Sequence, residues 1–531
     1  MGAGVSGLSV AHELIKQNFD VIVIERNPIA GGLARSTNFP EGPGEYGWRA
    51  YGPGYLNLQK IMSEIPISED KTVLDNLQPV NNYTILRQNG TQIVFDSSVS
   101  VWKKLLNIFK ITRKFTIKDY LIILKLFLYT KTSCSARIIS LDTIAWYYYV
   151  SGFSSEAKKF LVNPIGIFYG MEVKRMSTTS VLSLADNFLQ FTTGAPFSFS
   201  AMKGPTNDAW LNPWVKYLTD KGVNFQFNTE IHGIDCDSHG NITKVFTSDG
   251  DIKADIFVSS LPTESNAKIF ENNTKLHCQF KALAENSKQV QPSIAYYFDD
   301  IITFSHGYAV IYLVDTPWNL MILPQGKLWR EGGYWPPDST FGKDCWGIGI
   351  GNSNNPGTTG KSFTESTREE AIEEVWKQCL QSNILNLNAK TESGKPLAEI
   401  KNTGHCLWPS FQTNKDTNKL DTWEPKFSNN AYTYTDLPDS TKNPYVPNLY
   451  IATAYNKEYG HVYNMEAAAF FGRRTARYIS NSTEPEITSV PDPDNNFFKY
   501  IDYFCYKVGL PNSLITLTAI TGIIGVIAWT F

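Results

Sequence analysis

Residues 1–36 read MGAGVSGLSVAHELIKQNFDVIVIERNPIAGGLARS, and this stretch decides the fold. Gly2, Gly4 and Gly7 stand in the spacing G-x-G-x-x-G. An apolar pattern with helical spacing follows, then a short β-branched strand, and Glu25 ends that strand. A glycine turn followed by a helix, a strand and an acid at these distances is typical of a dinucleotide-binding unit.

Each part of this motif has a physical role in such a site. The first glycine permits a tight turn, the second lets the backbone approach a pyrophosphate, and the third lets helix and strand pack closely. The N-terminus of the helix offers unpaired N–H groups to phosphate oxygens. Glu25 is placed to accept hydrogen bonds from ribose hydroxyls. The predicted cofactor contacts of this segment are Gly2, Gly4, Val5, Ser6, Gly7, Glu25 and Arg26.

The strand that should precede the glycine turn is missing from this sequence. Such a turn ordinarily follows a buried strand of about five apolar residues, whereas here Met1 stands directly before it. Without that strand, the edges of its neighbours would be exposed. We therefore expect a truncated chain or a start codon assigned too late. Apolar codons in frame upstream would support this expectation, and an in-frame stop codon would contradict it.

Residues 27–36, NPIAGGLARS, resemble an extension found in the flavin-dependent amine oxidase and phytoene desaturase superfamily. The resemblance implies FAD as the cofactor, with Gly31, Gly32, Leu33 and Arg35 close to its pyrophosphate and isoalloxazine. The sequence GEYGWRAYGPGY at residues 44–55 is similar to a flavin-lining segment of desaturase-like members. A surface loop rich in Gly and Pro is the alternative interpretation of that second segment.

Two later blocks extend the resemblance in the order that the family has. Residues 203–262 resemble the second piece of the FAD domain, which makes Glu230 and Ile231 the implied adenine contacts. Residues 448–476 resemble the C-terminal helix of the family, whose N-terminus at Met465 and Glu466 points at the flavin pyrimidine edge. A helix dipole in that position would stabilise negative charge on reduced FAD.

The loop before this helix departs from the family pattern. An acid is usual beneath the ribityl chain, and Ala454 stands there instead. Covalent flavin attachment in the family uses a Cys in this loop, and residues 448–476 contain none, so FAD is expected to be non-covalent. Tyr455, Tyr459 and Tyr463 are candidates for an aromatic substrate wall. Their spacing suits packing on a helix equally well.

Composition narrows the class of protein. A chain of 531 residues with 42% hydrophobic and 19% charged residues is globular, and its length predicts about two or three structural units. The formal net charge of −3 provides no broad basic field for nucleic acid. The seven histidines and seven cysteines have no metal-ligand spacing and no C-x-x-C pair, so no metal site is predicted.

The remaining regions are less specific. Residues 56–190 are predicted to be mainly helical, and their most apolar part, residues 120–129, follows a run of Lys and Arg. That helix could lie on a membrane, but a buried helix is the preferred interpretation because ten apolar residues are too few to span a bilayer. Strands are predicted around residues 293–297, 308–314, 320–323 and 345–351, with one helix over residues 367–381.

The C-terminal tail is predicted to anchor the protein. Residues 514–531 carry no charge and reach the minimum length of a membrane span. We expect a tail anchor with the catalytic part on the cytoplasmic side. The alternative is an apolar helix packed on the body of the protein.

Together these features predict an α/β protein with a discontinuous Rossmann-type FAD-binding domain, an α+β substrate domain and a C-terminal hydrophobic helix. The predicted boundaries are residues 1–80, 200–265 and 440–482 for the FAD-binding domain, 81–199 and 266–439 for the substrate domain, 483–508 for a linker and 509–531 for a transmembrane tail.

The resemblance implies an FAD-dependent oxidoreductase that takes a hydride from a C–C or C–N bond and passes electrons to oxygen or a quinone. The apolar helix and the tail favour a lipophilic substrate. An oxidase of small amines is one alternative. The other is a degenerate, membrane-attached flavoprotein fold with a structural or binding role.

Overall fold

The structure is a computed structural model of the whole chain. It describes all residues except 41, 48, 53, 81, 97–99, 131–145, 170–171, 179, 182–198, 305–306, 308, 336–339, 432–435, 440–442, 458–462, 488–498, 511–512 and 531.

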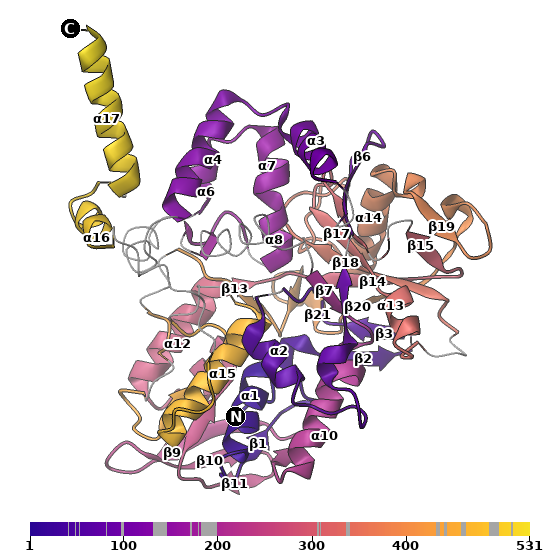
Figure 1. The fold of residues 1–531 in the computed structure, drawn as a ribbon. Coiled ribbons are helices and arrows are strands. Elements are labelled where there is room, and N and C mark those ends of the chain that lie inside the picture. Colours follow the sequence, from indigo (N-terminus) through magenta and orange to yellow (C-terminus); the bar gives the residue numbers. More distant parts are fainter. Residues whose placement is uncertain are drawn as a thin grey trace.

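One half of the molecule, here called the dinucleotide half, is built on two pairs of parallel strands (Figure 1). One pair is β1 with β8 and the other is β12 with β24. Helices α1 and α15 pack against each other beside them. The bounds of these elements are Val5–Ile15 for α1, Ile22–Ile24 for β1, Asn224–Gln226 for β8, Phe257–Ser259 for β12, Leu449–Ile451 for β24 and Met465–Ser480 for α15.

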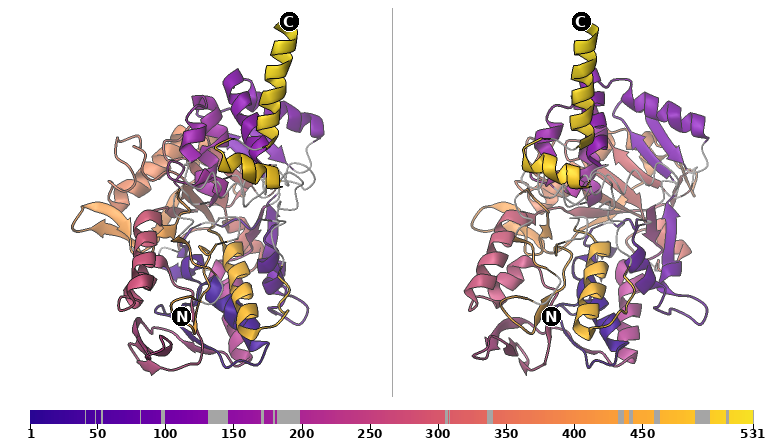
Figure 2. Two further views of the ribbon diagram at one scale, coloured as in Figure 1. Left: turned by 90° about the vertical axis from the view of Figure 1, so that its left-hand side faces the viewer. Right: turned by 60° about the vertical axis from the view of Figure 1, so that its left-hand side comes forward.

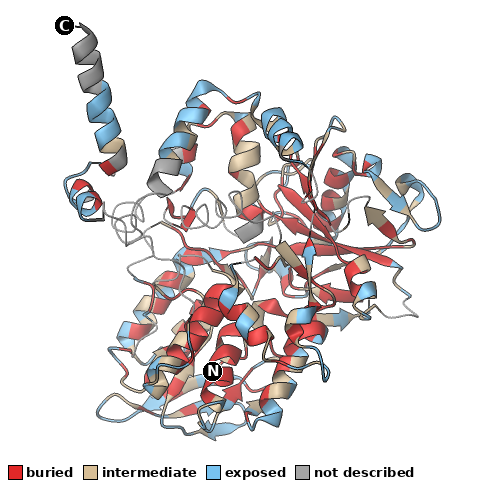
Figure 3. Cartoon of the chain, in the orientation of Figure 1, coloured by how far each residue is buried: buried red, intermediate tan, exposed pale blue. Residues whose placement is uncertain are grey.

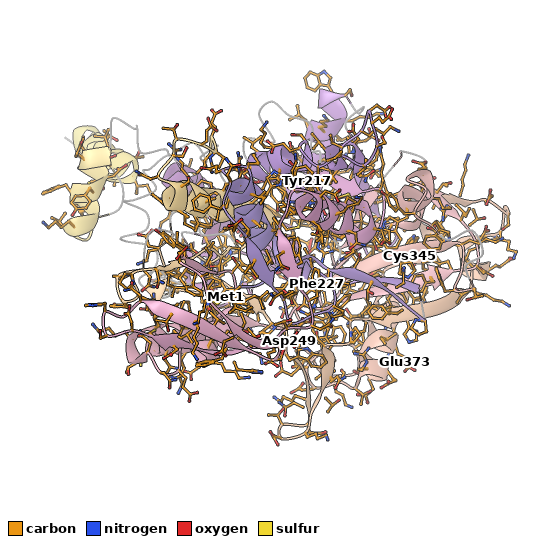
Figure 4. The ribbon with its side chains drawn as sticks, turned by 90° about the horizontal axis from the view of Figure 1, so that it is seen from below. Met1, Tyr217, Phe227, Asp249, Cys345 and Glu373 are labelled. Carbon is orange, nitrogen blue, oxygen red and sulfur yellow. The ribbon has the colours of Figure 1, made fainter. Side chains whose placement is uncertain are left out.

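The first two residues lie between the two strand pairs. Met1 donates from its amino group to the carbonyl of Val258 and accepts from the N–H of Ser260, both at 2.9 Å. Gly2 donates to the carbonyl of Ile24 at 2.8 Å. The view from below labels Met1 (Figure 4). The sheet of this half is therefore interrupted at the position of the strand that the motif leads one to expect, and Ile22 on β1 is exposed.

Further helices and a small sheet complete the dinucleotide half. Antiparallel strands β9, β10 and β11 form the sheet. The bounds are Leu56–Met62 for α2, Asn207–Leu211 for the π-helical turn η3, Asn212–Asp220 for α10, Ile231–Cys236 for β9, Ile242–Thr247 for β10, Gly250–Ile252 for β11, Thr263–Ile269 for α11 and Thr274–Ser287 for α12.

The other half contains a seven-stranded sheet in the order β20-β14-β18-β17-β16-β5-β6. Every neighbouring pair is antiparallel except β16 and β5. The four predicted strands are confirmed as β14, β16, β17 and β18, and the predicted helix as α14. The bounds are Asn82–Leu86 for β5, Gln92–Asp96 for β6, Ser293–Phe298 for β14, Ala309–Leu313 for β16, Leu320–Pro324 for β17, Asp344–Ile350 for β18, Arg368–Gln381 for α14 and Asn402–Leu407 for β20.

Short elements surround this sheet and connect the halves. They are η1 (Gly32–Ala34), β2 (Ser36–Phe39), β3 (Gly42–Glu45), η2 (Val73–Asn76), β4 (Leu77–Val80), β7 (Phe199–Met202), β13 (Lys288–Gln289), β15 (Ile302–Phe304), α13 (Gly326–Glu331), η4 (Ile384–Asn386), β19 (Ala389–Thr391), η5 (Leu397–Glu399), β21 (Phe411–Asn414), β22 (Lys419–Thr422) and β23 (Lys426–Phe427).

The prediction that residues 56–190 are mainly helical holds for α2 and is wrong for residues 77–96. Strands β4, β5 and β6 lie there, and the β5–β6 hairpin extends the seven-stranded sheet. Local sequence shows no clear strand period because the pairing of β5 with β16 joins segments far apart in the chain. Helices follow: α3 (Val101–Thr112), α4 (Ile117–Thr130), α6 (Trp146–Val150), α7 (Ser155–Leu161) and α8 (Asn163–Tyr169).

The prediction that residues 120–129 form a buried helix is only half right. Ile122, Ile123 and Leu126 of α4 are partly buried against a small core that includes Val150. The opposite side of the helix, with Leu121 and Leu124, faces solvent.

Two helices end the chain, α16 (Lys499–Lys507) and α17 (Ser513–Thr530). α16 lies within the predicted linker. Among the residues that the structure describes, no helix combines the length and the apolarity needed to cross a bilayer. The side chains of residues 523–531, which the predicted span includes, lie outside the described part. The structure therefore does not support the predicted transmembrane tail.

Candidate functional site

A cavity of about 530 Å³ lies between the two halves. Its lining comes from the glycine turn, the ends of β1 and β12 and the loop after β24. Segments of the half that contains the seven-stranded sheet complete it. Of the predicted contacts, those that line it are Gly2, Gly4, Val5, Ser6, Glu25, Arg26, Gly31, Gly32, Leu33, Glu230, Ile231, Ala454, Tyr455, Tyr463 and Met465.

The glycine turn leaves room for a ligand at the start of α1. A Cβ atom added to Gly4 would meet nothing closer than the Cα of Gly32, at 3.9 Å. Gly2 adopts a φ of +93°, which L side chains rarely reach, as the tight turn requires. Among the described residues, no side chain caps the N-terminus of α1. Its first N–H groups and the positive end of its dipole are thus available to an anion.

Gly7 has a packing role and does not line the cavity. A Cβ atom at this position would lie 2.0 Å from the carbonyl oxygen of Gly2. The close approach of helix and turn therefore requires glycine, as the motif predicts for its third position.

Glu25 sits at the end of β1 with its carboxylate held by the backbone. Its Oε2 accepts from the N–H of Ala3 at 2.9 Å, and its Oε1 accepts from the N–H of Asn27 at 3.0 Å. Oε1 also accepts from the side-chain amide of Asn27 at 2.6 Å. Each carboxylate oxygen has two lone pairs, so Oε2 can accept a further hydrogen bond. Glu25 lines the cavity together with Glu230 and Ile231, which lie at the start of β9.

Arg35 is turned away from the cavity. Its guanidinium pairs with Glu424, and its Cζ lies 5.6 Å from the ring centroid of Trp408. Glu424 lines the cavity. The Nη2 atom of Arg26 lies 3.8 Å from the Oε1 atom of Glu424. The sequence therefore placed Arg35 at the right segment, but its charge is used in an internal ion pair.

Glu466 is the third predicted contact, after Gly7 and Arg35, that does not line the cavity. It is buried, and its carboxylate accepts from the N–H groups of Asn57 and Leu58 at 2.9 and 2.8 Å. These groups belong to the start of α2, so Glu466 caps that helix. Burial raises its pKa to about 7, although these hydrogen bonds and the nearby Arg473 oppose that rise.

The loop after β24 forms the cavity wall between the halves. Thr453 and Ala454 line it, and Met465 at the start of α15 does so as well. Asn456 orders the loop, since its Oδ1 accepts from the N–H of Thr453 at 2.9 Å. No side-chain oxygen stands at position 454, as expected from the departure in the sequence.

Two of the three predicted tyrosines form an aromatic wall. The rings of Tyr455 and Tyr463 lie 5.1 and 5.7 Å from the ring of Phe427. The Tyr455 hydroxyl donates to the carbonyl of Leu261 at 2.7 Å. Burial raises the pKa of both tyrosine hydroxyls. Tyr459 lies outside the described residues.

No sequence motif marks a group of charged residues that also lines or adjoins the cavity. Lys426 lines the cavity and donates from Nζ to the Oε1 of Gln291 at 2.7 Å. Burial, followed by the positive charge of Arg49, lowers the pKa of Lys426 to about 7. Arg49 pairs with Glu45, whose pKa is raised by burial. Lys426 is therefore the lining residue best placed to exchange a proton near neutral pH.

A comparison with protein families agrees with the dinucleotide-binding motif of residues 1–36. Residues 1–65 match the family of NAD(P)-binding Rossmann-like domains. Comparison with curated proteins gives no match.

Solved structures resemble the chain over most of its length. Cyclohexylamine oxidase from Brevibacterium oxydans has a TM-score of 0.56 at 16% identity, over 90% of this chain and 97% of that one. Putrescine oxidase bound to putrescine has a TM-score of 0.60 at 13% identity, over 91% and 98%. An oxidoreductase from Methanosarcina mazei has a TM-score of 0.56 at 14% identity, over 91% and 99%.

At such low sequence identities, the structural similarity shows only that the fold is shared. The α/β architecture, the Rossmann-like N-terminal unit and the second half with its large sheet are shared over nearly the whole of each solved chain. The chain therefore has the fold of these two amine oxidases, and the resemblance seen in its sequence is confirmed at the level of the fold.

Proposed function

We propose that this protein is an FAD-dependent oxidoreductase that holds FAD without a covalent bond in the cavity. In this proposal a carbon of a C–C or C–N bond in a lipophilic substrate loses a hydride, the neighbouring carbon or nitrogen loses a proton, and that bond becomes a double bond. FAD, when bound, supplies the hydride acceptor. Oxygen or a quinone would take up the electrons afterwards.

The observation that carries the proposal is that one cavity joins all the required parts. Gly4 and Gly32 leave space at the uncapped end of α1, where a pyrophosphate would bind. The Glu25 carboxylate lies where it can accept from ribose hydroxyls, with Glu230 and Ile231 beyond it for the adenine. The residues present therefore fit a dinucleotide. No cysteine is among the described residues that line the cavity, which supports non-covalent binding.

The residues that line the cavity away from the glycine turn have distinct roles in the proposal. The unprotonated amine of Lys426 can accept a proton at Nζ above about pH 7, and Gln291 fixes the direction of that amine. The start of α15 at Met465 places positive partial charge where negative charge develops. Tyr455 and Tyr463 provide an apolar surface that excludes water.

The glycine turn offers the sharpest test of cofactor binding. A Gly4→Val variant should fold, because the added Cβ atom has only an ordinary contact with Gly32. Its side chain would nevertheless fill the approach of the pyrophosphate, so we expect FAD affinity to fall by more than about 100-fold. Titration of the apoprotein with FAD, followed by flavin fluorescence, measures this.

Gly54→Val is the matched control for this test. A Cβ atom at Gly54 has nothing within 4 Å, so this variant should bind FAD as the wild type does. Equal thermal unfolding of the two apoprotein variants would show that folding is intact. FAD binding by Gly4→Val at wild-type affinity would contradict the proposed placement.

A small amine is the second candidate substrate. The observation in its favour is that Tyr455 and Tyr463 line the cavity, because aromatic faces attract ammonium groups. Two of the similar structures are oxidases of cyclohexylamine and putrescine. Anaerobic flavin bleaching by these amines, compared with a long-chain isoprenoid in detergent, separates the candidates. Bleaching by the isoprenoid alone supports the lipophilic class.

A structural or binding role is the third candidate. It is favoured by Ala454, which cannot make the polar contact usual beneath the ribityl chain. A folded wild-type protein that binds no FAD would support this candidate and exclude the other two.

A further inference from the structure

The end of the molecule formed by α3, α4, α6, α7, α8, α16 and α17, here called the helical end, exposes many large apolar side chains. Exposed residues cover much of α3 and α4 in Figure 3. Most of the large apolar side chains that are exposed in the described structure lie on it. Trp102 of α3, Ile117 of α4 and Tyr500 of α16 are each 81% exposed. Phe109 of α3 and Leu121 of α4 are 62% and 61% exposed.

These side chains do not belong to the local core. Among the described side chains of α3, only Asn107 is buried, and its amide donates to the carbonyl of Val94 on β6 at 2.7 Å. The apolar side of α3 is therefore turned away from the protein. Burying such side chains is favourable, so contiguous exposed apolar patches usually mark an interaction surface.

The same face carries positive charge. Lysines and an arginine stand among its apolar residues: Lys103, Lys104, Lys110, Arg113, Lys114 and Lys118. Asp119 is the only acid in residues 101–126. It is buried, and it accepts from the N–H groups of Thr116 and Ser154 at 2.6 and 2.7 Å. The exposed face is thus both apolar and basic.

The other apolar helices continue this face. α17 contacts α4, and α16 contacts α17. Two further views keep them at the same end of the molecule, opposite α1 and the β9–β11 sheet (Figure 2). α8 belongs to this end too, and its Ile167 lines the cavity. The helical end therefore connects the apolar surface with the candidate site.

We propose that α3 and α4 lie on the surface of a lipid bilayer that contains anionic lipids. Trp102, Phe109 and Leu121 enter the boundary between headgroups and acyl chains, and the lysines of α3 bind anionic headgroups. A basic apolar face of two helices fits such a surface better than a purely apolar partner, which would leave the lysines without counter-charges.

Vesicle binding by the full-length protein tests this proposal. The wild type should sediment with phosphatidylcholine vesicles that contain phosphatidylserine, and less with phosphatidylcholine alone. The double variant Trp102→Glu/Phe109→Glu should bind at least about tenfold more weakly, because it replaces two exposed apolar side chains by charges that resist insertion. Leu380→Glu on α14 replaces an exposed apolar residue elsewhere and should bind as the wild type does.

A charge variant separates the two contributions. Lys103→Glu/Lys104→Glu should lose the preference for phosphatidylserine and the sensitivity to salt, since each lysine near an anionic surface contributes about 1 kcal/mol. These variants leave the cavity untouched, so FAD binding provides an independent reading. Loss of vesicle binding with FAD binding intact supports the surface separately from the proposed function.

Three results would overturn the proposal. The first is a wild type that binds neither kind of vesicle. The second is a Trp102→Glu/Phe109→Glu variant that binds as tightly as the wild type, since α17 alone would then hold the membrane. The third is a wild-type dimer that becomes a monomer in this variant without lipid, because the face would then bind a second copy of the chain.

Discussion

The two ends of the molecule use apolar residues in opposite ways. In the dinucleotide half, Trp210 and Trp214 are completely buried and stacked with ring centroids 5.8 Å apart. At the helical end, Trp102 stands almost wholly in solvent. Both regions show helical apolar periodicity in the sequence. The periodicity identifies a helix, and only the tertiary structure shows whether its apolar side faces a core or a partner.

The contrast between the two ends predicts that replacing a buried and an exposed tryptophan will have very different effects on folding stability, and this is the largest difference that we expect. Trp210→Ala should lower the free energy of unfolding by about 3–5 kcal/mol, because it removes a buried ring and leaves a cavity. Trp102→Ala should change it by no more than about 0.5 kcal/mol. Urea unfolding of both variants in detergent-free buffer measures the difference. Equal losses would mean that α3 is packed as tightly as the dinucleotide half.

A smaller effect is expected from Lys426, a half-buried lysine on the cavity wall. The pKa of Lys426 is lowered to about 7 from its ordinary value of 10.5. Between these values the unfolded chain binds more protons than the folded one, so this lysine makes stability rise with pH across that window. Lys426→Met should abolish that rise, which we expect to be at least about 1 kcal/mol.

Unfolding of the apoprotein across this pH window measures the Lys426 effect. Lys216→Met on α10 is the control, because Lys216 is exposed and paired only with Asp220 among the salt bridges of the described residues. Its pH dependence should follow that of the wild type. An unchanged slope in Lys426→Met would show that the lysine is hydrated and titrates normally.

The sequence was sufficient where function depends on local geometry. The spacing of Gly2, Gly4 and Gly7 predicts the turn at the start of α1, and Glu25 lies at the predicted end of β1. Strands β14, β16, β17 and β18 were predicted because each is a short, strongly apolar run. Their side chains are buried on both faces, as in a strand between two layers.

The sequence was insufficient where distant segments meet. Glu424 and Lys426 reach the cavity only because β22 and β23 fold back against it, and no local motif marks them. Glu466 stands one residue from the cavity lining but binds the start of α2. Arg35 is drawn to Glu424, which lies far along the chain. Partner choice of this kind is a tertiary property.

The absorption spectrum of the purified wild-type protein, recorded before and after heating, tests the central claim most directly. We expect the yellow bands of a flavin that leaves the protein on denaturation, since the cavity offers no cysteine for a covalent bond among its described lining residues. Colour that stays with the denatured chain would contradict non-covalent binding. A colourless, folded protein that FAD cannot restore would contradict the assignment of the cavity as a flavin site.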